Sequence, residues 1–232
     1  MLKQLFLTVF LALSANVQAE ITTENRVYPY QNTALTPEER AHDLVKRLTR
    51  EEKVALMQNS SPAVERLQIK PYNWWNEALH GVGRAGLATV FPQSIGMAAS
   101  FDNVLLYDVF TAVSDEARAK TRLAREEGNY DIYRGLTFWT PNINIFRDPR
   151  WVRGHETYGE DPYLVGSMGV ASVKGYQGNL DSQEDVLACI KHLVGGSQSV
   201  DGTNSAPTDV SERTLREVFL SPYERCLTEV KA

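Results

Sequence analysis

The chain has 232 residues, of which 24 are basic and 29 acidic, so its net charge at neutral pH is −5. This balance, without a long run of like charges, excludes a basic nucleic-acid-binding face. Hydrophobic residues make up 43% of the chain, enough to bury the core of one or two domains of about 100–200 residues each.

The first residues have the pattern of a secretory signal peptide. Lys3 gives a positive start, residues 5–13 are apolar, and Val17-Gln18-Ala19 offers small residues for cleavage after Ala19. The apolar run is shorter than the about 20 residues that a membrane span needs. We therefore predict a signal peptide at 1–19 and a secreted or periplasmic protein without a membrane span; a buried N-terminal helix is the weaker alternative.

Several helices can be predicted from caps and apolar spacing. Residues 20–35 are polar and irregular, which predicts an N-terminal arm. Thr36 and Thr49 each open a capping box. Further helices are expected at 102–126, at 163–176 and from Ser211 onward, where Pro222 should kink or break the last one.

Four apolar runs predict strands, at 72–75, 89–91, 136–145 and 186–190. Strands that alternate with helices favour βαβ units and a parallel sheet. A (β/α)8 barrel takes about 250 residues, and the helical pattern still runs at Ala232. We therefore expect an α/β fold over residues 36–232: the first four strand-helix units of an incomplete TIM-like barrel, with the strands side by side in chain order.

The two cysteines lie in different kinds of segment. Cys189 lies in an apolar, strand-like run and Cys226 lies in a helical one. An oxidising compartment would permit a disulfide between them, whereas their apolar surroundings favour two buried thiols. Both alternatives remain open at this stage.

The stretch at 142–162, NINIFRDPRWVRGHETYGEDP, is the richest in polar chemistry. An apolar run leads into a loop with arginines, a histidine and acids, and Asp161-Pro162 then opens a helix. Loops that follow strands are where α/β enzymes build their sites. Arginine, carboxylate and indole groups together suit a hydroxyl-rich ring. The sequence has no glycine-rich phosphate loop and no zinc-ligand spacing, so no metal or organic cofactor is implied.

Several ordered motifs carry a resemblance to a known family. They are YNWWNEALHGVGRAG at 72–86, ATVFPQSIGMAASFD at 88–102, the stretch at 135–164, the Lys191-His192 pair and SERTLREVFLSPYE at 211–224. From about residue 30 onward the chain resembles glycoside hydrolase family 3, and the first motif favours its β-xylosidase branch. The resemblance implies a (β/α)8-like barrel and a retaining exo-β-glycosidase.

The resemblance also implies sugar-binding roles for Glu77, Arg153, Lys191 and His192, and the indole of Trp75 stands beside Glu77. Cationic groups donate charge-assisted hydrogen bonds to hydroxyls and fix the orientation of a ring. Each residue also has a purely structural explanation. Trp75 could belong to the core, Arg153 could pair with Glu156 or Asp161, and a histidine such as His192 is more often structural.

The departures from the family pattern concern loops and catalysis. Val152 stands where the family has glycine, which would disturb the loop if the backbone there needs a positive φ. Leu193 replaces a common aromatic, and Val200-Asp201-Gly202 lacks the expected glutamate. In the family, the nucleophile lies after a later strand and the acid/base residue lies later still, commonly in a second domain. A retaining glycosidase needs these two carboxyl groups about 5–5.5 Å apart. We therefore assign no catalytic residue in this chain.

The favoured function is the N-terminal part of an exported β-xylosidase, with β-glucosidase next, acting on β-linked xylo- or gluco-oligosaccharides. The alternative is an inactive truncated fragment, a half-barrel that binds carbohydrate weakly. By itself the chain is expected not to turn over a substrate, and the open edge of its fourth strand favours self-association.

Overall fold

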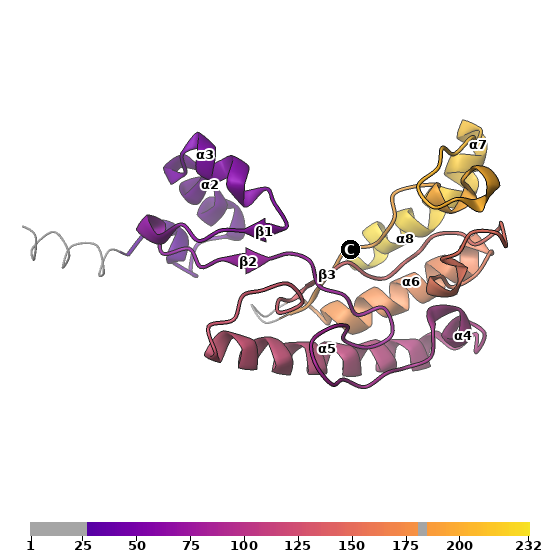
Figure 1. Cartoon of the computed structure of the whole chain (residues 1–232), viewed down its shortest axis with the longest axis horizontal. Coiled ribbons are helices and arrows are strands. Elements are labelled where there is room, and N and C mark those ends of the chain that lie inside the picture. Colours follow the sequence, from indigo (N-terminus) through magenta and orange to yellow (C-terminus); the bar gives the residue numbers. More distant parts are fainter. Residues whose placement is uncertain (1–26, 181–184) are drawn as a thin grey trace, which may run out of the picture. The chain divides into compact units, whose positions relative to one another are not determined.

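The computed structural model describes residues 27–180 and 185–232. The predicted signal peptide and the part of the predicted arm before residue 27 lie outside the described residues. The chain divides into two compact units, Met1–Pro71 and Tyr72–Ala232 (Figure 1). Within the described residues, no helix is both long and apolar enough to cross a membrane.

The first unit is built from short helices around a small core. Its elements are η1 (Pro29–Gln31), α2 (Pro37–Arg47), α3 (Arg50–Leu56), β1 (Ser60–Ser61) and η2 (Glu65–Leu67). Thr36 Oγ1 accepts the N–H of Glu39 at 3.3 Å, and the Glu39 carboxylate accepts the Thr36 N–H at 2.9 Å. Thr49 and Glu52 repeat this exchange. Because each box satisfies two orphan N–H groups, both helices begin where the sequence predicts.

The second unit alternates short strands with long helices. Its elements are β2 (Tyr72–Asn73), α4 (Ser94–Ala98), α5 (Asn103–Glu126), β3 (Thr137–Phe138), η3 (Gly154–Glu156), α6 (Pro162–Gln177), β4 (Leu187–Ala188), η4 (Gly196–Gln198), η5 (Val200–Gly202), α7 (Glu212–Thr214), the π-helical η6 (Leu215–Leu220) and α8 (Ser221–Val230).

Parallel pairing brings three segments of the second unit together. β3 and β4 pair in parallel, with Phe138 opposite Ala188. Asn76, just after β2, forms a parallel bridge with Phe138, and Asn142 forms one with Lys191 further along. The polar residues that follow each segment therefore emerge at the same edge.

The predicted strand at 89–91 is not a strand, so the segment after β2 pairs directly with β3. The Glu116 side chain on α5 accepts the Thr89 N–H at 3.1 Å and the Thr89 hydroxyl at 2.7 Å. Pro92 follows at once and has no N–H to donate. This segment therefore hydrogen-bonds to a helix and a loop, and the expected order of four neighbouring strands is wrong at its second position.

The predicted strand at 136–145 is also shorter than expected. Regular pairing stops after Phe138, because the chain then reaches Pro141, which cannot donate to a ladder. Single hydrogen bonds continue the contact beyond that point: Lys191 N–H donates to Pro141 O at 3.1 Å, and the Ile143 N–H donates to Lys191 O at 2.8 Å. The segment stays buried and extended through Ile145, so it still delivers the following loop to the sheet edge.

Three long helices enclose the core, with α5 packed against α6 and α6 against α8 (Figure 1). The approach of α5 to α6 is close at Gly175, where an added Cβ would stand 2.6 Å from Tyr107 O and 2.8 Å from Phe110 Cβ. The ring of Tyr176 lies against Phe110, with centroids 4.6 Å apart. Gly175 thus lets α6 approach α5 closely, and the rings of Tyr176 on α6 and Phe110 on α5 pack beside it in the core.

The helix around Pro222 is widened but not broken. The chain is helical from Glu212 to Val230, and the π-helical η6 lies just before Ser221 and Pro222. A proline ring clashes with the carbonyl of the fourth residue before it, and the wider turn of a π-helix moves that carbonyl away. The predicted break is therefore absorbed as a change in helix type.

The cysteines are both free thiols. Cys226 is fully buried, and burial raises its pKa to about 12. Cys189 is exposed, contrary to the favoured alternative of two buried thiols. The reason is strand alternation: Val186 and Ala188 face the helices, so Leu187 and Cys189 point to the other side of the sheet.

Candidate functional site

Asn76 fixes the segment that carries Glu77. Its Nδ2 donates to Thr137 O at 2.9 Å, and its Oδ1 accepts the Gly135 N–H at 2.7 Å. The Asn76 carbonyl also accepts the Trp139 N–H at 2.9 Å. A fully bonded, buried amide therefore locks this segment to β3, so Glu77 leaves the sheet in a defined direction.

The carboxylate of Glu77 has a partner on each side. Lys191 Nζ lies 3.4 Å from Glu77 Oε2, and Trp75 Nε1 donates to Glu77 Oε1 at 2.9 Å. The indole of Trp75 stacks on that of Trp139, with ring centroids 4.5 Å apart and an interplanar angle of 18°. A cation, a carboxylate and an indole face are thus held together, as the strand-end motifs predict.

Arg153 pairs with Glu156, as its structural explanation proposed, and also lines the pocket that contains Glu77. Its Nε and NH2 atoms donate to the two Glu156 oxygens at 2.8 and 2.6 Å. Burial alone would raise the Glu156 pKa, but the hydrogen bonds and charge of Arg153 hold it below its usual value. The same hydrogen bonds raise the Arg153 pKa. Glu156 is therefore an ionised anchor for the guanidinium.

His192 follows Lys191 across a cis peptide bond. Its Nδ1 lies 2.8 Å from Asn144 Oδ1, which also accepts the His192 backbone N–H at 3.1 Å. Because an amide oxygen only accepts, Nδ1 carries the proton and Nε2 is left as an acceptor. Burial, together with the charges of Arg153 and Lys191, lowers the pKa of His192 to about 4. The imidazole is therefore neutral at physiological pH.

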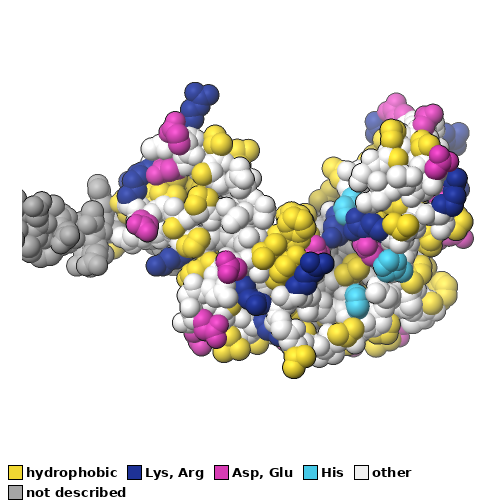
Figure 2. Space-filling view, in the orientation of Figure 1, with side chains coloured by type: hydrophobic (Ala, Val, Ile, Leu, Met, Phe, Trp, Pro, Cys, Tyr) yellow, Lys and Arg dark blue, Asp and Glu magenta, His cyan; other side chains and the backbone are white. Residues whose placement is uncertain are grey.

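These groups border a pocket of about 390 Å³. Its lining residues are Trp75, Glu77, Leu79, His80, Gly81, Gly83, Arg84, Tyr133, Arg153, Glu156 and Lys191. Four of the five predicted binding residues thus line one pocket. His192 does not line it, although the charges of Arg153 and Lys191 help to lower the His192 pKa. Figure 2 shows basic, acidic and histidine side chains gathered on this face of the second unit.

Several lining residues were not predicted from the sequence. His80 Nδ1 lies 2.8 Å from Phe91 O, so the ring is held by the backbone. Arg84 and Tyr133 were not singled out. Their guanidinium and phenol meet at the rim, with the Arg84 Cζ 5.6 Å from the ring centroid of Tyr133. The only available signal was their place in the sequence: Arg84 lies within the 72–86 motif, and Tyr133 lies shortly before β3.

The departure at Val152 leaves the loop undisturbed. Val152 is not among the described residues with a positive φ, and 72% of it is exposed. The condition under which a side chain would strain the loop is therefore not met. In the loop at 200–202, where the sequence lacks the family's glutamate, Asp201 adopts a φ of 55° and forms an ion pair with Arg150 at 3.2 Å. It does not line the pocket.

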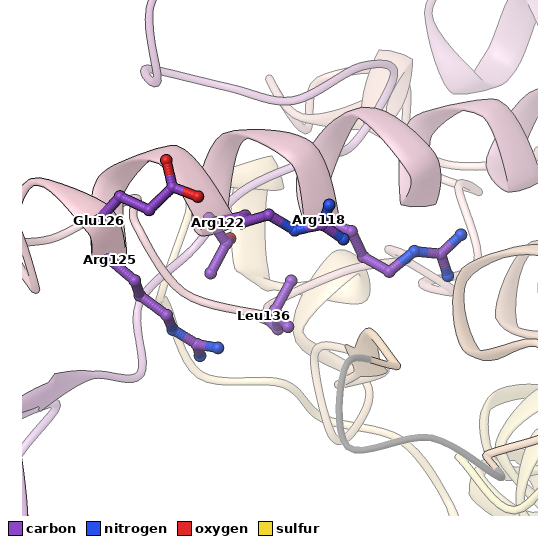
Figure 3. Close-up of a pocket in the computed structure, with 6 residues that line it drawn as sticks. Arg118, Arg122, Arg125, Glu126 and Leu136 are labelled. Atoms are coloured by element: carbon purple, nitrogen blue, oxygen red, sulfur yellow. The ribbon is translucent and has the colours of Figure 1, made fainter.

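A second pocket, of about 270 Å³, lies between α5 and Leu136. In Figure 3, Arg118 and Arg125 extend from α5 on either side of Leu136. None of the predicted binding residues lines it. Within the described ranges, the structure also holds no group of three or more histidine, cysteine or acidic residues placed to bind a metal ion.

The parallel βαβ arrangement, with a pocket beside the ends of its strands, is typical of α/β barrel proteins, and comparison with known proteins identifies the family. Residues 32–232 match the model of the family described as "Glycosyl hydrolase family 3 N terminal domain". The chain belongs to glycoside hydrolase family 3, as the motifs predict, and its fold is part of that family's TIM-like (β/α)8 barrel.

Among its relatives, a xylan 1,4-β-xylosidase of Xylanibacter ruminicola is 46% identical over 98% of the chain and 26% of the relative. Probable β-D-xylosidase 7 of Arabidopsis thaliana is 38% identical over 89% of the chain and 29% of the relative. The chain thus spans about a quarter of the length of these curated relatives.

Solved structures show the same likeness. The exo-β-xylosidase XlnD, solved with a xylobiose aziridine activity-based probe, is 32% identical with a TM-score of 0.73, covering 85% of the chain and 26% of that structure. A β-glucosidase from Erythrobacter marinus is 25% identical with a TM-score of 0.72, covering 88% of the chain and 32% of that structure.

Proposed function

We propose that this chain forms the sugar-binding part of an exo-acting, retaining β-glycosidase. The observation that carries the proposal is the placement of Glu77 between Lys191 and Trp75 at the wall of a pocket. A carboxylate oriented by a cation and an indole N–H can accept hydrogen bonds from sugar hydroxyls, while Lys191 and Arg153 donate to them. Exposed indole faces such as Trp75 can cover the apolar face of a ring.

β-Xylosidase is the favoured activity of the complete enzyme, because the relatives with 46% and 38% identity are xylosidases. The second candidate is β-glucosidase, which is supported by the likeness to the Erythrobacter marinus structure. Non-reducing-end xylosyl or glucosyl units of β-linked oligosaccharides, such as those released from xylan, would be the substrates.

The pocket residues favour binding rather than bond cleavage. Both acids that line it are held in ion pairs, Glu77 with Lys191 and Glu156 with Arg153. A general acid needs a raised pKa, whereas that of Glu156 is lowered. By the family resemblance, the nucleophile would follow a later strand of the barrel, and the acid/base residue would lie later still, commonly in a second domain. With this chain alone, weak carbohydrate binding without turnover is the expected behaviour.

Two further proposals concern the setting of the enzyme. The signal-peptide pattern at 1–19 supports export to the periplasm or the medium. Self-association is supported by β4, which within the described residues pairs with β3 on one edge only. Its exposed Leu187 would be covered by an added strand.

A chimera tests the proposed activity. This chain replaces the matching quarter of the Xylanibacter ruminicola xylosidase, and hydrolysis of aryl β-xylosides and β-glucosides is measured. We expect xyloside to be preferred, and Glu77→Gln to lower kcat/KM by about 10- to 100-fold, since a hydrogen bond to a charged group is lost. Arg216→Gln, in an exposed helical ion pair, is the matched control. A chimera that prefers glucoside supports the second candidate, and an unchanged Glu77→Gln variant contradicts the assignment.

A further inference from the structure

The rim of the pocket carries an arginine whose charge no carboxylate neutralises. Of the charged groups that line the pocket, Lys191 pairs with Glu77 and Arg153 pairs with Glu156. Arg84 contacts Tyr133, with Arg84 NH1 3.5 Å from the phenol oxygen. Within residues 27–180 and 185–232, the structure gives Arg84 no acidic partner. The pocket therefore has one cation more than it needs for its own acids.

Arg84 and Tyr133 are held at the rim by the backbone. Both have positive φ values, 55° for Arg84 and 67° for Tyr133. Side chains other than glycine adopt this conformation at a cost, and such outliers concentrate at ligand clamps. The Tyr133 N–H donates to Trp75 O at 3.1 Å, and Lys120 Nζ donates to Ala85 O at 3.2 Å, next to Arg84. Hydrogen bonds thus hold the backbone at Tyr133 and next to Arg84.

The guanidinium is preorganised for a planar anion. It lies against the Tyr133 ring with Cζ 5.6 Å from the ring centroid, which limits the freedom that an exposed arginine normally loses on binding. A guanidinium presents a fork of donors that matches a carboxylate, and the phenol can donate beside it. The nearby carboxylates of Glu77 and Glu156 disfavour a dianion such as phosphate, so a single negative charge fits best.

We propose that Arg84 and Tyr133 form a subsite for the carboxylate of a uronic acid carried on the oligosaccharide. This inference rests on the proposed function, because Trp75, Glu77 and Lys191 would hold the neutral sugar in the same pocket. The favoured ligand is then an acidic xylo-oligosaccharide. Its neutral units occupy the pocket, and its uronic acid lies against the rim.

Three probes separate sugar binding in the pocket from carboxylate binding at Arg84. They are xylobiose, xylobiose with a glucuronic acid branch, and the methyl ester of that branched sugar. The ester keeps the shape and removes the charge. Dissociation constants are measured by NMR titration of the 232-residue chain. We expect the acid to bind about fivefold more tightly than its ester, the upper range for an exposed ion pair. That preference should disappear in about 1 M salt, where exposed charges are screened.

Matched variants assign the preference to Arg84. Arg84→Gln should bind acid and ester equally, Arg84→Lys should keep part of the preference, and Tyr133→Phe should weaken it. Arg125→Gln removes the same charge from the α5 pocket of Figure 3 and should leave the preference intact. Circular dichroism and xylobiose affinity show that each variant is folded. If Arg84→Gln does not fold, Arg84→Lys and the salt titration show whether the preference for the acid depends on the charge of Arg84.

Equal binding of acid and ester by the unmodified chain overturns the inference while leaving the proposed function intact, as does a preference that survives Arg84→Gln. Failure of all three probes to bind contradicts the proposed function and the inference with it.

Discussion

Lys191 Nζ lies 3.4 Å from Glu77 Oε2, although 114 positions separate the two residues in the chain. Parallel pairing explains the meeting, because Asn76 bridges to β3 and Asn142 bridges to Lys191. Both side chains therefore leave the sheet at the same edge. Each has a further support: Trp75 holds Glu77, and Lys191 N donates to Pro141 O at 3.1 Å.

The first prediction is that Lys191→Met weakens sugar binding more than it weakens the fold. The Glu77 carboxylate would keep the Trp75 hydrogen bond and would lose its cation, so xylose affinity should fall about tenfold. The free energy of unfolding should change by about 1 kcal/mol or less, because the pair is partly open to solvent. NMR titration and urea unfolding measure the two effects.

Arg213→Gln is the control for Lys191→Met, since it removes a cation from an exposed helical ion pair with Glu217. It should leave both quantities unchanged. Loss of stability without loss of xylose affinity in Lys191→Met would show that the ion pair is structural.

The helices were predictable because their signals are local. Thr36 and Thr49 begin helices through bonds to residues three positions on, and Asp161 caps α6 through the N–H of Leu164 at 2.7 Å. The strand at 89–91 failed for the opposite reason. Its N–H is taken by Glu116, which lies 27 positions away on another element. Nothing in the local pattern of three β-forming residues reports such a competitor.

The candidate site also contains residues that the sequence could predict and residues that it could not. The family resemblance singled out Glu77 and Lys191, and their places after apolar runs predicted that they would meet at one edge of the sheet. Arg84 and Tyr133 reach the pocket through left-handed backbone conformations, which sequence periodicity does not report. The pairing of Arg153 with Glu156 was foreseen as the structural alternative to sugar contact, and the structure contains this ion pair at the wall of the pocket.

The second prediction concerns Val152, where the family has glycine. Because Val152 is exposed and is not among the described residues with a positive φ, glycine brings no relief of strain. Val152→Gly should instead lower the free energy of unfolding by about 0.5–1 kcal/mol, since it adds freedom to the unfolded chain. Urea unfolding is the measurement, with Val152→Ala as the control for lost side-chain contacts. A stabilised glycine variant would mean that the side chain does push the loop.

The third prediction tests the contact between α5 and α6. Gly175→Ala places a Cβ 2.6 Å from Tyr107 O and 3.0 Å from Thr111 N, so backbone atoms of α5 must move. Overpacking of this kind costs about 1–3 kcal/mol, more than the about 1 kcal/mol gained from the higher helix propensity of alanine. Thermal unfolding should therefore show a lower Tm.

Gly96→Ala in α4 is the matched control for Gly175→Ala, because the added Cβ would lie 3.8 Å from Pro92 Cβ, an ordinary van der Waals distance. It should leave the Tm unchanged or raise it. Equal effects of the two substitutions would contradict the close approach of α5 to α6.

The last prediction is a pH dependence of stability that originates at His192. Burial, and then the charges of Arg153 and Lys191, lower its pKa to about 4 in the folded chain, against about 6.5 when unfolded. Between these values the unfolded state binds more protons, so stability is complete above pH 6.5 and falls as the pH is lowered toward 4. Because the ring is only half buried, solvent screening reduces the effect to about 1–2 kcal/mol. Urea unfolding of His192→Asn at pH 7 and pH 5 should show a smaller loss than the unmodified chain, whereas the exposed His155→Asn keeps the full loss. Equal pH dependence in all three proteins would mean that His192 takes up its proton as readily in the folded chain as in the unfolded one.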